Sequence, residues 1–263
     1  MSLLKIGVQL SSFRQPFRKS LELAARTGAS GVEIDLRRDV DIRQMSDSAV
    51  RQIRKWIDDF NLRVAAVRFR TRRGYHHPDD LEQRLQATRD MMVLAYRLGT
   101  PTLINQIGTV PGTPDDSSWQ LLVESLSELG RFGQRAGTML TAETGSEDGA
   151  ALLKLIEAIP EGCLPVAFNP GNLLVQGFSP HDALQVLAPY ITYVSARDAT
   201  RDLARGRGIE VPLGRGSVDF AEILGTLHEH QFRGYVTVDR DGLDGPPAEV
   251  AAGVQYLRAL MLA

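Results

Sequence analysis

The chain has 263 residues, of which 43% are hydrophobic and 24% are charged, so it is long enough to bury one large core. Its formal net charge of -2 excludes the broad cationic field with which a protein holds nucleic-acid phosphates. The first residues lack the long apolar segment of a signal peptide, and no apolar run is long enough to span a bilayer. We therefore expect a cytoplasmic protein with no nucleic-acid and no membrane partner.

Short β-branched or apolar runs alternate along the chain with longer segments whose apolar residues recur at helical spacing. The predicted strands are Leu4–Leu10, Gly31–Leu36, Arg63–Phe69, Pro101–Asn105, Thr138–Glu143, Leu164–Asn169, Ile191–Ser195 and Gly234–Asp239. The predicted helices are Pro16–Thr27, Ser46–Phe60, Pro78–Leu98, Asp115–Ala136, Gly149–Ile159, Ser179–Leu187, Phe220–His230 and Ala248–Leu262. Gly28 and Gly99 suit helix ends, whereas Pro16 and Pro78 suit first helical turns.

Eight strand and helix units in a chain of this length predict an α/β fold, a single-domain (β/α)8 TIM barrel over residues 1–263. An open doubly wound sheet shows the same alternation, but it more often has five or six strands and a glycine-rich turn after the first strand. Here the sequence 9–12 reads Gln-Leu-Ser-Ser, and no G-x-G-x-x-G motif opens the first helix. No linker or low-complexity tract divides the chain, which favours one domain.

Polar or charged residues end every predicted strand. In a (β/α)8 barrel the active site forms at these C-terminal strand ends, because packed side chains fill the rest of the interior. One polar strand end alone indicates little, since strand ends also meet water, but agreement among all eight predicts a polar pocket. The residues are Gln9, Glu33, Asp35, Arg68, Arg70, Asn105, Gln106, Glu143, Asn169, Ser195 and Asp239.

Glu143 and Asp239 are the strongest catalytic candidates, because each is an acid that ends an apolar run. A carboxylate at such a position must either face the pocket or be paired. Together with Glu33, they would place carboxylates around one small cavity. Such groups can move protons on either face of a substrate or share a divalent cation.

On these residues the chain resembles the sugar phosphate isomerase/epimerase superfamily, the xylose-isomerase-like barrels. The resemblance runs nearly from end to end and implies a barrel enzyme of carbohydrate metabolism. Its motifs are Lys5–Leu10, Gly31–Asp35, Thr141–Glu143, Phe168–Leu173, Tyr193–Asp198 and Val211–Phe220.

The resemblance also implies a divalent metal at the ends of strands five to eight, and the matching positions are Glu143, Asn169, Ser195 and Asp239. Only Glu143 is the family's usual residue. Asn169 contributes no charge, Ser195 replaces a histidine with a weak neutral ligand, and Asp239 has a shorter arm than glutamate. Loss of the nitrogen ligand disfavours zinc, cobalt and nickel, which leaves magnesium, manganese or no metal as open alternatives.

Further substrate-binding positions follow from the same resemblance. Asn172 and Arg201 match residues expected to hydrogen-bond a polyol, and Arg197 is expected to clamp an oxyanion or a phosphate. If Arg68 points inward from the arginine-rich run 68–73, it favours an anionic group on the substrate. Glu33 and Asn105 complete the predicted substrate contacts, and the glycine-rich run 214–217 is a second candidate anion site.

Two functional hypotheses follow. In the first, the chain is an isomerase or epimerase in which Glu143 and Asp239 move a proton alpha to a carbonyl. A metal cation stabilises the enediolate, or, without a metal, Arg68 or Arg197 does so. In the second, three changed ligand positions mark a metal-free binding or regulatory barrel that has lost catalysis. The expected partner in both is a polyol, a sugar or a sugar phosphate, and a homodimer is left open.

Overall fold

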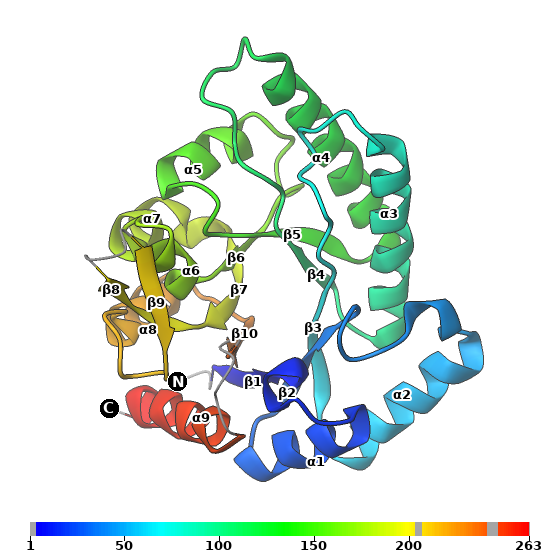
Figure 1. Cartoon of the computed structure of the whole chain (residues 1–263), viewed down its shortest axis with the longest axis vertical. Coiled ribbons are helices and arrows are strands. Elements are labelled where there is room, and N and C mark those ends of the chain that lie inside the picture. The colour runs from blue at the N-terminus through cyan, green and yellow to red at the C-terminus, as the bar shows by residue number, and fades with distance from the viewer. Residues whose placement is uncertain (1–3, 203–206, 241–246, 263) are drawn as a thin grey trace.

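The computed structural model describes residues 4–202, 207–240 and 247–262. Its parallel strands close into a barrel in the order β1-β10-β7-β6-β5-β4-β3-β2, with the helices outside (Figure 1). The structure thus confirms the predicted (β/α)8 barrel, and each predicted strand overlaps an observed one. The barrel strands are β1 (Lys5–Gln9), β2 (Gly31–Asp35), β3 (Arg63–Arg68), β4 (Thr102–Asn105), β5 (Met139–Glu143), β6 (Val166–Phe168), β7 (Ile191–Ala196) and β10 (Tyr235–Val238).

The outer helices also follow the predicted segments closely. They are α1 (Phe17–Thr27), α2 (Asp47–Asp59), α3 (Leu81–Leu98), α4 (Ser117–Ala136), α5 (Gly149–Glu157), α7 (Pro180–Leu187), α8 (Phe220–Glu229) and α9 (Pro247–Leu262). Gly28 and Gly99 end α1 and α3 with φ of 78° and 96°, as predicted. The prolines differ from the prediction: Pro16 is the N-cap of α1, and α3 begins only at Leu81, after Pro78.

A polar hairpin and a short helix were not predicted. The strands β8 (Asp198–Asp202) and β9 (Arg207–Val211) pair antiparallel, and α6 (Pro170–Val175) packs against them beside the barrel (Figure 1). Both strands are short and mostly polar in sequence, and every residue of β9 is at least partly exposed, so the hairpin lacks the sustained apolar pattern by which a buried strand is predicted. Among the described residues, none of the helices combines the length and apolar character needed to cross a bilayer.

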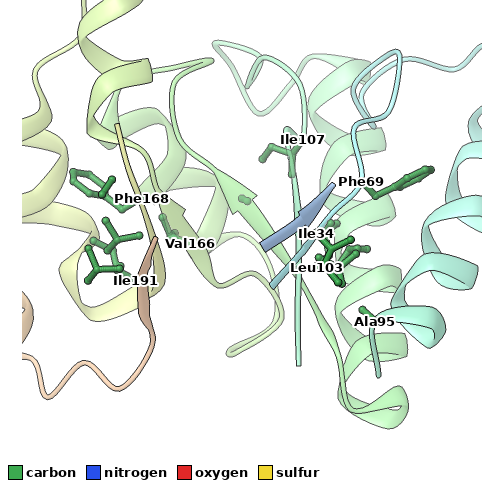
Figure 2. Packing of buried hydrophobic residues seen from close by; sticks show 14 of the residues in the cluster. Ile34, Phe69, Ala95, Leu103, Ile107, Val166, Phe168 and Ile191 are labelled. Atoms are coloured by element: carbon green, nitrogen blue, oxygen red, sulfur yellow. The ribbon is translucent and has the colours of Figure 1, made fainter. Parts of the chain in front are cut away.

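Buried apolar side chains form two separate clusters on opposite sides of the barrel wall. The larger cluster packs between strands and helices, and Figure 2 shows Ile34 and Leu103 within it. The smaller cluster occupies the barrel interior and consists of Ala65, Ala66, Ile104, Ala167 and Tyr193, with Tyr235 packed against it. Gly31 leaves the room that Tyr235 needs, because a Cβ at Gly31 would lie 2.5 Å from the tyrosine ring.

The residues that follow the interior cluster along the strands lie on the same inner side of the barrel wall. Side chains alternate along a strand, so residues two positions apart point to the same side of the barrel wall. Arg68 therefore follows Ala66 on the inner side, and Ser195 follows Tyr193. Arg68 and Ser195 thus belong to a polar layer at the C-terminal ends of the strands, next to the apolar interior cluster.

Candidate functional site

Arg68, the last residue of β3, lies at the centre of this polar layer with its side chain fully buried. Its Nε donates to Glu33 Oε1 at 2.5 Å, and its Nη1 donates to Glu143 Oε2 at 2.6 Å. Its Nη2 donates to Ser195 Oγ at 3.2 Å and lies 3.9 Å from Asp239 Oδ2. Burial disfavours the charged form, but the surrounding carboxylates raise the pKa of Arg68 well above its ordinary value. Arg68 is therefore a permanent cation inside the barrel.

Glu33, from β2, is fully buried and holds Arg68 from one side. Its Oε1 also accepts from Gln9 Nε2 at 2.7 Å, and its Oε2 accepts from the Tyr193 hydroxyl at 2.7 Å. Burial and the charge of Glu33 raise the pKa of Tyr193 well above its ordinary value, so this tyrosine remains a donor. Both oxygens of Glu33 are thus committed to the chain's own groups.

Glu143, at the end of β5, is held in the same way on the opposite side of Arg68. Its Oε1 accepts from Asn169 Nδ2 at 2.9 Å, and Arg68 occupies its Oε2. Burial opposes ionisation, but the charge of Arg68 and the hydrogen bonds hold the pKa of Glu143 below its ordinary value. Glu143 is therefore an ionised carboxylate with a donor on each oxygen.

Asp239 and Arg197 form a second buried pair beside this centre. Arg197 Nη2 donates to Asp239 Oδ2 at 2.8 Å, and its Nη1 donates to Asn172 Oδ1 at 3.1 Å. Burial lowers the pKa of Arg197, but Asp239, Glu210 and Glu143 raise it to a net value above the ordinary one. Asp239 Oδ1, by contrast, is buried and finds no hydrogen-bond partner in the described part of the chain. It is a buried acceptor that the described groups of the chain leave unsatisfied.

Most of the predicted site residues meet in one network. The members are Glu33, Arg68, Glu143, Asn169, Asn172, Ser195, Arg197 and Asp239. Two predicted substrate contacts lie apart from it. Asn105 is buried, and its amide holds Thr71 and Tyr75 in the loop after β3. Arg201 lies exposed on β8, opposite Gly208 of β9.

Two participants in this region were missed from the sequence. Tyr193 could have been found by alternation, because it lies two residues before Ser195 on the same strand. Asp198 lies in the motif Tyr193–Asp198 but was given no role from the sequence: its carboxylate accepts backbone N–H groups of Gly214 at 3.0 Å and of Gly216 at 2.8 Å. These N–H groups belong to the run predicted as a second anion site, so they bind a carboxylate of the chain itself.

The four positions matched to metal ligands do not present a donor set that fits a divalent ion. Asn169 directs its amide N–H toward Glu143, and its Oδ1 caps α6 by accepting from the Asn172 N–H at 3.0 Å. Ser195 Oγ accepts from the guanidinium of Arg68. Among residues 4–202, 207–240 and 247–262, no group of three or more His, Cys, Asp or Glu side chains is placed to hold a metal.

Comparison with known proteins agrees with this architecture. The family model described as a xylose isomerase-like TIM barrel matches residues 21–260. An inosose dehydratase from Clostridium beijerinckii is 22% identical over 256 residues, covering 86% of this chain and 82% of that protein. A xylose isomerase domain protein from Planctomyces limnophilus superposes with a TM-score of 0.84 at 21% identity, over 98% of this chain and 95% of that one. A xylose isomerase-like barrel from Mycobacterium smegmatis, solved in complex with magnesium, gives 0.80 at 17% identity, over 99% and 97% of the two chains.

Proposed function

Because this chain belongs to the xylose isomerase-like TIM barrel family, we propose that it is an enzyme that removes the proton alpha to a carbonyl group of a polyhydroxylated substrate. The substrate class is a sugar or a cyclic polyol ketone. One observation carries the proposal: a buried carboxylate, Asp239, keeps one oxygen free beside the guanidinium of Arg197 at the C-terminal end of the barrel. A base and an adjacent cation are the two groups that enolate formation requires.

Asp239, rather than Glu143, is the base in this proposal. Both oxygens of Glu143 accept hydrogen bonds, from Arg68 and from Asn169, which stabilise its ionised form, lower its pKa and make it the weaker base. Asp239 Oδ1 has no such partner. The sequence-based hypothesis has one of the two carboxylates remove the proton and the other return it, and the proposal assigns the removal to Asp239.

The first step is balanced within the site. The substrate C–H bond breaks, its proton goes to Asp239 Oδ1, and its electron pair forms a carbon–carbon double bond as the carbonyl oxygen gains negative charge. Arg197, held at 2.8 Å from Asp239 Oδ2, is the cation nearest to this base and stabilises that oxygen. Asn172 positions Arg197 by accepting from its other terminal nitrogen.

Two outcomes of the enolate are chemically open. In an isomerase, the hydroxyl proton of the deprotonated carbon moves to the former carbonyl oxygen, and the proton on Asp239 goes to the former carbonyl carbon. In an epimerase, a proton returns to the same carbon on its other face. Alternatively, the enolate oxygen re-forms the carbonyl, the electron pair of the enolate double bond forms a new double bond between the α and β carbons, and the β C–O bond breaks. The β-hydroxyl then leaves as water with the proton held by Asp239. The similarity to an inosose dehydratase favours elimination, and neither route consumes an oxidant or a reductant.

A binding barrel without catalysis is the second candidate. Arg68 and Glu143 support it, because they neutralise each other and their side chains are 0% and 2% exposed. Such a centre would recognise a ligand only through Asp239, Arg197 and their neighbours.

Exchange of substrate hydrogen with deuterium oxide, followed by NMR, tests the proposal on a panel of ketoses and cyclic polyol ketones. The wild type is expected to exchange the alpha proton of at least one compound, and Asp239→Asn should slow that exchange by about 10³-fold. Asp90→Asn, a change to an exposed acid on α3, is the matched control and should exchange at the wild-type rate. Exchange that is unaffected by Asp239→Asn contradicts the proposal, and ligand binding without any exchange supports the binding barrel.

A further inference from the structure

The guanidinium of Arg68 stands among the positions that match metal ligands in related barrels. It donates to Glu143 and to Ser195, and it lies 3.9 Å from Asp239. The fourth position, Asn169, joins the same group through its 2.9 Å hydrogen bond to Glu143 Oε1. One side chain from β3 therefore reaches three of the four positions directly and the fourth through one intervening residue.

We propose that Arg68 is the resident cation of this barrel and takes the place of a divalent metal ion, so that the protein binds its ligand without a metal. The inference concerns the same site as the proposed function but does not depend on which reaction occurs there. It rests on the donor groups and on the charge around them.

At the four positions that match metal ligands, every side-chain oxygen except one already accepts a hydrogen bond from the chain itself. Divalent magnesium and manganese bind oxygen lone pairs. Glu143 uses both oxygens to accept hydrogen bonds, and Asn169 uses its carbonyl oxygen to cap α6. Of the side-chain oxygens at these four positions, only Asp239 Oδ1 has no hydrogen-bond partner in the described ranges, and one carboxylate oxygen does not make a metal site.

The charges lead to the same conclusion. Glu33, Glu143 and Asp239 contribute three negative charges, and Arg68 and Arg197 contribute two positive ones. A divalent ion added here would lie beside two buried guanidinium groups, whose positive charges repel it strongly at low dielectric. Removal of Arg68 alone would instead leave two uncompensated carboxylates and an empty space between them.

Manganese titration of chelator-treated protein, followed by calorimetry, tests the inference without any substrate. The wild type should show no stoichiometric binding, whereas Arg68→Ala should bind manganese at least about tenfold more tightly than the wild type. Arg72→Ala removes an exposed arginine of the following loop and should behave as the wild type does.

One manganese ion per wild-type chain, lost in Glu143→Gln, would overturn the inference. Absence of binding in an Arg68→Ala protein with native circular dichroism would overturn it as well, because the guanidinium would then not be what excludes the ion. If Arg68→Ala does not fold, thermal unfolding of the wild type with and without chelator tests the inference instead. An unfolding temperature that chelator lowers contradicts a metal-free site, and an unchanged unfolding temperature supports it. These results are separate from those of deuterium exchange, so either idea can fail alone.

Discussion

Arg68 Nη1 donates to Glu143 Oε2 at 2.6 Å, although the two residues are 75 positions apart in the sequence and both are buried. The contact joins β3 to β5 across the barrel interior, over the intervening strand β4. A buried ion pair of this kind contributes less through its attraction than it costs when one partner is removed. The contribution of this ion pair to stability is therefore measured best by comparing the unfolding free energies of the two single variants with that of the double variant.

Glu143→Gln should lower the free energy of unfolding by about 3 kcal/mol, because it leaves Arg68 with less compensating charge in a buried position. Urea unfolding of Glu143→Gln, Arg68→Met and the double variant measures the coupling. We expect the double variant to lose clearly less than the sum of the two single losses. Additivity to within about 0.5 kcal/mol would mean that the two side chains do not act as a pair.

Asn169→Asp should destabilise the protein by about 2 kcal/mol at neutral pH, since it places a second carboxylate against Glu143 Oε1 where an N–H now donates. Acidification should relieve part of the loss, because one of the two carboxyl groups can then hold a proton. Asn172→Asp is the matched control: its Oδ1 accepts from Arg197, so added negative charge there should be tolerated. Equal losses in the two variants would contradict this explanation.

The barrel and its polar rim were predictable from the sequence because both are local patterns. Strand alternation requires only a few consecutive residues, and each acid or amide at a strand end is visible in its own run. Ser195 illustrates the limit: it was expected as a weak metal ligand, whereas the structure shows it accepting from Arg68, 127 positions away. Nothing in either local segment specifies that contact.

Two further features depended on distant contacts in the same way, and a third had a weak local pattern. The hairpin of β8 and β9 was missed because its strands are short and mostly polar, with Ile209 and Val211 the only large apolar residues among residues 198–202 and 207–211. Asn105 was expected to contact substrate, but its amide holds the loop after β3. Asp198 organises a loop that begins 16 residues later, so its role appears only once the chain has folded.

Glu147 should make stability depend on pH between about 5 and 8. Burial raises its pKa from 4.5 to about 8, the charge of Asp148 adds to this rise, and the backbone N–H of Val110 opposes it only in part. Between these values the folded state holds a proton that the unfolded state has released, so the free energy of unfolding falls as pH rises. The stabilisation is complete below pH 4.5 and is lost through about pH 8.

Glu147→Gln, which stays neutral, should flatten this dependence by up to about 1.4 kcal/mol per pH unit. Denaturant unfolding at several pH values measures the slope. Asp39, whose pKa burial raises to about 7, should contribute a slope of the same sign that persists in the variant. If the free energy of unfolding depends on pH equally in the wild type and in Glu147→Gln, a group other than Glu147 causes the dependence.

Asp198→Asn should loosen the loop before α8 and destabilise the protein by about 2 kcal/mol, because a carboxylate that accepts several backbone N–H groups becomes a side chain with one acceptor oxygen. Hydrogen exchange should rise at Gly214, Gly216 and Val218, the residues that donate to it. Asp219→Ala, which removes only the N-cap of α8, should cost about 1 kcal/mol and leave exchange at Gly214 unchanged. Equal protection of Gly214 in wild type and Asp198→Asn would show that the loop is held by other contacts.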